Sequence, residues 1–378
     1  MQRWSFNYRL FFKKNMVGIL VLAAFGTSVL LWDRGLLLKT IALSEVLPNT
    51  IMTLPTLNEI YAAEKDATKE DNAAKENDEA KEAKDDEKAN TEPEKAGDDK
   101  TKEPEKIDTS KLFLMTDEQK QNYSNINYLK KNIYTVAAIT DINTGDIDPE
   151  KFLNMDFSLD TKEKGPKVLI FHTHSHEEYS DSNMELGLDE GVVGVGEHLK
   201  QILEDDYGIE TMHCTERFDY VDSKMTTTGA YERMEPVIEK ILQDNPSIEI
   251  AIDIHRDGLT DESIHLVTNI DGKQTAQVMF FNGLCRVYED EQLVPTEGLE
   301  NPNLEQNLAF SFNMKYAADE MYSGFARKSY LNAYRYSLNM LPKSLLVEVG
   351  AQNNTKEEAM NAMEPLAKIL VTVLNKNT

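Results

Sequence analysis

The chain is 378 residues long and has a formal net charge of −26 at pH 7, so it has room for one large domain or two ordinary ones. The acidic balance argues against a nucleic-acid partner, because binding by counterion release needs clustered lysines and arginines. Two cysteines, Cys214 and Cys285, are too few for a disulfide framework, and they can either form one bridge or serve as small buried residues.

The N-terminal segment differs from the acidic remainder. Residues 1–15 are basic, and residues 16–32 read MVGILVLAAFGTSVLLW without a charge. As a helix this run rises about 25 Å, close to the lower limit for a bilayer core of about 30 Å. We expect an uncleaved single-pass anchor with a cytoplasmic N-terminus and an exported remainder. A cleaved signal peptide is the alternative, but the apolar run is long and no small-x-small site follows it closely.

A charged spacer separates this segment from the rest of the chain. Residues 33–61 contain a second apolar run, LLLKTIALSEVL, and form a juxtamembrane segment. From 62 to 106 there is no Leu, Ile, Val, Met or aromatic residue, so this stretch has nothing to bury and cannot offset its ordering entropy. We therefore predict a disordered linker over 62–107, followed by one sizeable domain over 108–378.

Within 108–378, strand-like apolar runs alternate with amphipathic helical patterns. A Thr355-x-x-Glu358 capping box opens the last helical pattern. This alternation predicts an α/β fold with a central, mostly parallel sheet covered by helices on both faces. The runs predict strands at 167–171, 209–213, 248–254 and 344–350, and helices at 192–203, 230–242, from 304 onward and at 355–373.

The three strongest strands each end in a titratable side chain. They read VLIF before His172, AIDI before His255 and LLV before Glu348. Functional groups in α/β folds gather at the carboxyl ends of parallel strands, so these three side chains are predicted to converge on one point.

The first of these strand ends carries the run HTHSH. Alternate residues of an extended segment face the same way, so His172, His174 and His176 are predicted to point together. Imidazole nitrogen suits zinc, and one or two of the three are expected to bind it. The alternative for each histidine is a structural role with satisfied hydrogen bonds.

The second strand end is DIHRDG, residues 253–258. His255 is a candidate second ligand whose ring a neighbouring carboxylate would orient, and Arg256 is a candidate for holding substrate or stabilising an oxyanion. An ion-pair network that closes a loop is the alternative.

The third strand end places Glu348 inside an apolar strand. A buried carboxylate is costly, so an acid here needs a reason. A raised pKa beside a metal-activated water would suit a general base, and a buried salt bridge to an arginine is the alternative.

Together these segments resemble the stage II sporulation protein P family. The resemblance rests on VLIFHTHSHEEY, the helix start VVGVG, IAIDIHRDG and LLVEVGAQNNTKEEA, in this order, and covers most of residues 165–378. It implies a membrane-anchored peptidoglycan hydrolase related to zinc-dependent N-acetylmuramoyl-L-alanine amidases, acting in septal wall remodelling and engulfment during sporulation. It further implies a glycan-cleaving partner enzyme, a multispanning membrane partner and an extracytoplasmic catalytic domain.

The resemblance also implies roles for individual residues. His172, Glu177 and His255 would bind Zn²⁺, Glu348 would be the catalytic acid/base, and Glu190 is the alternative to Glu177. The reaction would be hydrolysis of the amide between the lactyl group of N-acetylmuramic acid and L-alanine, and the family also suggests cleavage of stem-peptide cross-links.

Two other functions remain open from the sequence. HTHSHEE also resembles the HxHxDH segment of binuclear metallohydrolases, which would bind two metal ions per domain instead of one. A non-catalytic, membrane-tethered scaffold that binds the cell wall is the second alternative, although Glu348 and His255 are both present.

Overall fold

The computed structural model describes residues 111–376 apart from 161, 223 and 262. The predicted anchor, juxtamembrane segment and linker therefore lie outside the described residues. Within them, no helix combines the length and apolar character needed to cross a bilayer. Cys214 and Cys285 are both free thiols, so the bridge that the sequence left open is not formed.

Apolar runs and helical patterns form elements close to their predicted positions. The central sheet consists of β1 (Tyr134–Val136), β2 (Val168–Phe171), β3 (Thr211–His213), β6 (Ile250–Asp257), β9 (Val278–Gly283), β12 (Ser329–Asn332) and β13 (Lys343–Ala351). Three two-stranded ribbons flank it: β4 (Tyr220–Val221) with β5 (Lys224–Met225), β7 (Val267–Ile270) with β8 (Lys273–Ala276), and β10 (Arg286–Glu289) with β11 (Gln292–Pro295). The helices are α4 (Asp117–Tyr123), α5 (Ile126–Asn132), α6 (Pro149–Asn154), the 3-10 turn η2 (Leu188–Glu190), α7 (Val192–Asp205), α8 (Ala230–Asp244), α9 (Leu304–Met321), α10 (Lys356–Asn361) and α11 (Met363–Leu374).

The last predicted helix is divided in two. Thr355 and Glu358 form the predicted capping box at the start of α10, with each side chain accepting a hydrogen bond from the other residue's backbone N–H. The helix breaks at Ala362, and Pro365 lies in the first turn of α11. Proline has no backbone N–H to continue the hydrogen bonding of a preceding helix, and in the first turn of a new helix that missing N–H costs nothing.

The sheet is mostly parallel, as predicted, but it contains one reversal. Its strand order is β1-β12-β9-β13-β6-β2-β3, and the only antiparallel pair in the described sheet is β13 with β9. Strands β3, β2, β6 and β13 therefore run one way, and β9, β12 and β1 run the other way. The carboxyl ends of the first group lie at the same edge of the sheet as the amino ends of the second.

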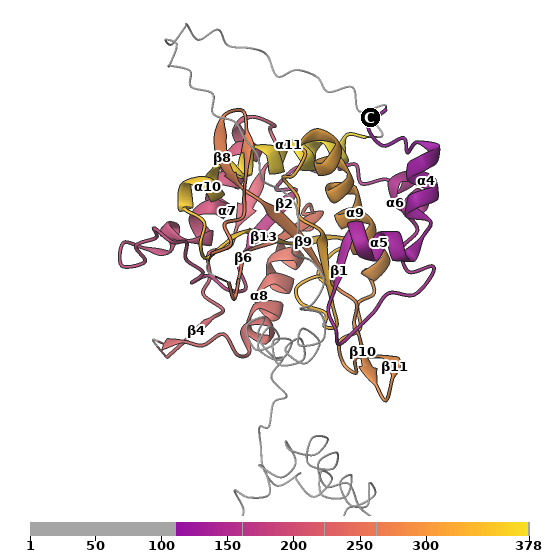
Figure 1. The fold of residues 1–378 in the computed structure, drawn as a ribbon. Coiled ribbons are helices and arrows are strands. Elements are labelled where there is room, and N and C mark those ends of the chain that lie inside the picture. The colour runs from indigo at the N-terminus through magenta and orange to yellow at the C-terminus, as the bar shows by residue number, and fades with distance from the viewer. Residues whose placement is uncertain (1–110, 161, 223, 262, 377–378) are drawn as a thin grey trace, which may run out of the picture. The chain divides into compact units, whose positions relative to one another are not determined.

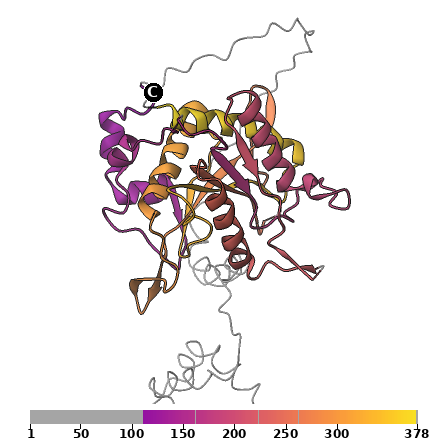
Figure 2. The ribbon, with the colours of Figure 1, turned by 180° about the vertical axis from the view of Figure 1, so that it is seen from behind.

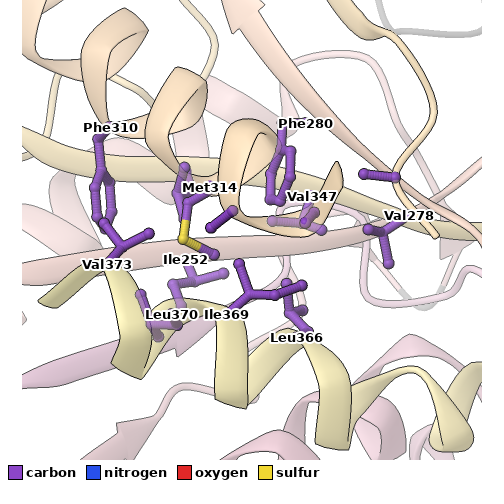
Figure 3. Close-up of a cluster of buried hydrophobic side chains, with 14 of the residues drawn as sticks. Ile252, Val278, Phe280, Phe310, Met314, Val347, Leu366, Ile369, Leu370 and Val373 are labelled. Atoms are coloured by element: carbon purple, nitrogen blue, oxygen red, sulfur yellow. The ribbon is translucent and has the colours of Figure 1, made fainter. Parts of the chain in front are cut away.

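Helices cover both faces, which confirms the layered architecture. The larger core packs α7, α9 and α11 against one face, and the smaller core packs α8 against the other. Figures 1 and 2 show α8 on one side of the sheet and α9 and α11 on the opposite side. Figure 3 shows side chains of α9 and α11 meeting those of three strands in the larger core; the labelled ones are Ile252, Val278, Phe280, Phe310, Met314, Val347, Leu366, Ile369, Leu370 and Val373.

Alternation along each strand decides which face a side chain occupies. In β6, Ile252 and Ile254 enter the larger core, so Asp253 and His255 point to the α8 face. In β13, Val347 enters the larger core, so Glu348 also points to the α8 face.

Candidate functional site

His255 and Glu348 lie side by side on neighbouring strands. They are register partners in the parallel pair of β6 and β13, and both side chains point to the α8 face. Each is almost fully buried, with 0% and 1% of its surface exposed, respectively. The sequence prediction that these two strand ends meet is therefore matched by the geometry.

Glu348 is a buried acid with an unsatisfied oxygen. Within the described residues its Oε2 has no hydrogen-bond partner. Burial raises the pKa of Glu348 well above its usual range; the charge of His255 opposes this rise, and the Asp257 carboxylate adds to it. Arg327 pairs with Asp257 at 2.6 Å and not with Glu348, so the predicted alternative of a Glu348–arginine bridge is not formed.

His255 lies between two carboxylates. Its Nε2 is 2.8 Å from Oδ1 of Asp253, and its Nδ1 is 3.5 Å from Oε2 of Glu177. Neither contact meets the geometry of a hydrogen bond, so both ring nitrogens lack a hydrogen-bond partner among the described residues. Burial alone would lower the pKa of His255, but the two carboxylates raise it well above its ordinary value. The two carboxylates thus favour a positive charge at this point, which either a ring proton or a bound cation can supply.

Asp253 holds its position through the loop that follows β2. Thr173 donates to its two carboxylate oxygens, from the backbone N–H at 2.9 Å and from Oγ1 at 2.6 Å. Burial would raise the pKa of Asp253, but the charge of His255 and these hydrogen bonds lower it. Asp253 is the neighbouring carboxylate of the DIHRDG segment, and its position two residues before His255 on the same strand places both side chains on one face.

The three histidines of HTHSH do not point together, because β2 ends at Phe171 and the chain then turns. His172 lies on the α7 face, where its Nδ1 is 2.9 Å from the Ile254 carbonyl oxygen and its Nε2 is 2.9 Å from His213 Nε2. His176 instead contacts Asp219 at 2.8 Å through Nδ1. The prediction of a shared direction is therefore wrong, and the paired HxH arrangement of a binuclear site is not formed.

The structure does not bring His172 together with His255 and Glu348. Its ring is packed under α7, where a Cβ added at Gly196 would lie 2.7 Å from its Cε1 and Nε2. The glycine in the VVGVG helix start is thus explained by the close approach of this ring. His213 continues the contact to the surface through Glu197, which is 2.9 Å from its Nδ1.

His174 is the histidine of the motif that reaches the α8 face. It is 4% exposed, and within the described residues both of its ring nitrogens lack a hydrogen-bond partner. Its ring centroid is 5.4 Å from that of His255 and 5.8 Å from that of Tyr231, a residue of α8 that the sequence analysis did not single out. Burial lowers the pKa of His174, which favours a neutral ring able to donate an electron pair to a cation.

Of the two candidate glutamate ligands, only Glu177 is near His255. It accepts a hydrogen bond at 2.8 Å from the backbone N–H of Arg256, whose side chain donates through Nε to the Glu178 carbonyl. Burial would raise the pKa of Glu177, but the charge of His255, and after it that of Arg256, lowers it. Glu190 is instead paired with Lys356 at 2.9 Å.

These side chains do not yet form a closed metal site. Among the described residues, no group of three or more His, Cys, Asp or Glu side chains has its donor atoms gathered around one point. The unsatisfied atoms nevertheless fit a cation: they are both nitrogens of His174 and of His255, with the Glu177 carboxylate beside them. Imidazole nitrogen and carboxylate oxygen are among the ligand atoms that bind zinc in proteins.

Comparison with known proteins gives one family and several structural likenesses. A family model described as Stage II sporulation protein P (SpoIIP) matches residues 43–371. The Stage II sporulation protein P of Bacillus subtilis (strain 168) is 25% identical over 219 residues, which are 53% of this chain and 49% of the relative. The chain thus matches about half the length of this curated relative.

Two solved amidase structures are also similar to part of the chain. The N-acetylmuramoyl-L-alanine amidase AmiC2 of Nostoc punctiforme is 13% identical with a TM-score of 0.32, covering 55% of this chain and 97% of its own. The CwlD amidase from Clostridioides difficile, solved in complex with the GerS lipoprotein, is 13% identical with a TM-score of 0.33, covering 56% and 95%. These scores are too low to support an argument about fold or activity.

Proposed function

The chain belongs to the stage II sporulation protein P family, and from this membership and the site we propose that it is a peptidoglycan hydrolase of the amidase type that acts in sporulation. The proposed reaction is hydrolysis of the amide that joins the lactyl group of N-acetylmuramic acid to L-alanine. One observation carries the proposal: Glu348 is a buried glutamate with an unsatisfied oxygen, and it lies beside His255, whose ring nitrogens also lack hydrogen-bond partners among the described residues.

We propose that zinc is the cofactor and that His174, Glu177 and His255 hold it. The resemblance to the family suggested His172 as the first ligand, but that ring lies on the opposite face and contacts His213 and a backbone carbonyl. His174 has no such partner among the described residues and lies next to His255. It therefore replaces His172 in the proposed ligand set.

The chemistry divides between the cofactor and the chain. When bound, zinc polarises the scissile carbonyl and lowers the pKa of a water toward about 7. Glu348 would accept a proton from the attacking water and deliver it to the departing amine. A cation beside Glu348 favours the ionised form that a base requires, against the burial that now raises its pKa. Arg256 would be a positioning residue, because its backbone N–H holds Glu177 at 2.8 Å.

Three further elements of the proposal come from the sequence alone. Residues 16–32 would anchor the chain in the cell membrane, with the N-terminus in the cytoplasm and residues 108–378 outside it. The enzyme would act in septal wall remodelling and engulfment. Its partners would be a glycan-cleaving sporulation enzyme and a multispanning membrane protein.

The experiment incubates the full chain with purified peptidoglycan and identifies the products by mass spectrometry. We expect released peptides that begin with L-alanine, loss of this release with a chelator, and its recovery with added zinc. Glu348→Gln should be inactive, whereas Glu178→Gln, which changes an exposed carboxylate nearby, should retain activity. Hydrolysis that survives both the chelator and Glu348→Gln would refute the proposal.

The same experiment separates the alternative functions. Products cut within the stem-peptide cross-links would reveal the second activity that the family suggests. Two bound metal ions per chain would favour the binuclear hydrolase. Peptidoglycan that is bound by the wild-type chain and left intact in the presence of zinc would favour the scaffold.

A further inference from the structure

A pocket of about 510 Å³ opens beside the candidate site, at the amino ends of β9 and β12. Its lining includes Asp257, Met279, Arg327, Lys328 and Tyr330. A volume of this size is typical of sites that hold a small ligand or one segment of a larger one. None of these residues takes part in the proposed reaction itself.

The pocket adjoins the reacting groups through the sheet itself. Met279 is the antiparallel register partner of Glu348, so the two side chains lie on the same face of neighbouring strands. Asp257 follows His255 by two residues on β6 and therefore points to the same face. A substrate whose scissile bond lies at Glu348 would extend directly into this pocket.

One wall of the pocket is aromatic. Tyr330 of β12 stacks on Phe281 of β9, with ring centroids 5.2 Å apart and an angle of 29° between the planes. Phe281 is buried in the smaller core, which fixes the position of the tyrosine ring. The wall is therefore a rigid surface against which an extended segment can lie.

The pocket also carries positive charge. Arg327 pairs with Asp257 at 2.6 Å through Nη1, and the described residues accept no other hydrogen bond from its guanidinium, which has five N–H donors. Lys328 is exposed and lies 3.5 Å from the Lys131 carbonyl; no carboxylate in the described part of the chain pairs with it. Two cations against one anion leave a local excess of one positive charge in a chain whose net charge is −26.

We propose that this pocket binds the peptide part of the substrate and that Arg327 and Lys328 recognise one of its carboxylates. The inference rests on the proposed function, because an amide bond between a sugar lactyl group and L-alanine has the peptide on its amine side. The peptide carries carboxylates, whereas N-acetylated sugars are uncharged apart from the lactyl group that the amide consumes. Charge complementarity therefore assigns the peptide, and not the glycan, to the pocket.

The test compares two ligands on the full-length Glu348→Gln chain with zinc present. The ligands are N-acetylmuramoyl-L-alanyl-D-glutamic acid and its diamide, and binding is measured by calorimetry. We expect the diacid to bind about tenfold more tightly, since a hydrogen bond to a charged group contributes about one factor of ten or more. Adding Lys328→Glu should remove this preference and leave diamide binding unchanged. Arg327→Gln should also weaken diacid binding.

Lys273→Glu is the matched control, because it reverses an exposed charge on the β7–β8 ribbon that does not line the pocket. It should leave both affinities unchanged. Equal binding of diacid and diamide, binding of neither, or equal weakening of both by Lys328→Glu would each overturn the subsite. Hydrolysis of peptidoglycan by the wild-type chain is measured separately. If the chain hydrolyses peptidoglycan but binds the diacid and the diamide equally, only the proposed subsite is wrong. If it prefers the diacid but does not hydrolyse peptidoglycan, only the proposed function is wrong.

Discussion

Two histidines of the HTHSH motif should respond in opposite ways to substitution. His174→Ala removes a buried ring whose nitrogens have no hydrogen-bond partner in the described residues and which lies next to His255. His172→Ala removes a ring on the other face of the sheet, where it contacts His213 and the Ile254 carbonyl. We expect His174→Ala to lose zinc binding and His172→Ala to keep it.

The expected sizes follow from linkage between binding and folding. Zinc at 100 times its dissociation constant stabilises a chain by about 2.7 kcal/mol. Loss of one direct ligand should weaken binding by at least the roughly 100-fold seen for outer partners of a metal site, so His174→Ala would gain only about 0.4 kcal/mol at the same zinc concentration. Without metal, His172→Ala should lower the free energy of unfolding by about 1–3 kcal/mol, because removal of the buried ring leaves its hydrogen-bond partners unsatisfied. With zinc, this variant should still gain about 2.7 kcal/mol.

The assay is chemical unfolding followed by circular dichroism, with and without zinc, for the wild-type chain and both variants. The quantity compared is the zinc-dependent increment in the free energy of unfolding, which removes the difference in metal-free stability. His176→Ala serves as a control, because that ring is held by Asp219 and does not contact His255. An increment lost in His172→Ala and retained in His174→Ala would refute the ligand assignment.

Three further predictions concern single positions. Glu348→Gln should abolish the proposed hydrolysis, by about 10²-fold or more, and change the free energy of unfolding by less than about 1 kcal/mol; an active variant would contradict its role as the acid/base. Gly196→Ala should destabilise the fold by about 1–2 kcal/mol in urea unfolding, since its Cβ would clash with the buried His172 ring and outweigh the better helix propensity of alanine; a stabilised variant would contradict this packing. Burial lowers the pKa of Lys376 to about 8, so between pH 8 and 10 the unfolded state binds more protons, and the stability of wild type relative to Lys376→Met should rise with pH; a constant difference would contradict the shift.

Several elements of the fold, including β2, β3, β6 and β13, could be predicted from the sequence because their signals are local. Apolar runs such as VLIF and AIDI have the length and composition of buried strands, and the Thr355–Glu358 box marks a helix start. The break at Ala362 was not predicted, although Pro365 gave a local signal for it. The reversal between β13 and β9 had no such signal, because strand direction depends on which distant segments pair.

The candidate site was only partly predictable for the same reason. His255 and Glu348 were identified as residues that end apolar strands, and their pairing followed once β6 and β13 became neighbours. The shared direction predicted for His172, His174 and His176 was wrong, since the rule of alternate residues holds only while a strand continues, and β2 ends before the motif begins. Tyr231 and the pocket beside Met279 depend on a helix and strands far apart in the chain.

The sequence by itself determined where the most apolar strands and the most strongly amphipathic helices form and which ionisable side chains interrupt apolar runs. The tertiary structure alone decided on which face of the sheet each of those side chains lies. Phe171 pairs with Asp253, so the face that Asp253 shares with His255 is the face that Phe171 occupies, and His172 must take the other. Alternation fixes faces within one strand, but the register between strands arises from packing of the whole sheet, and a shift of one residue exchanges the two faces.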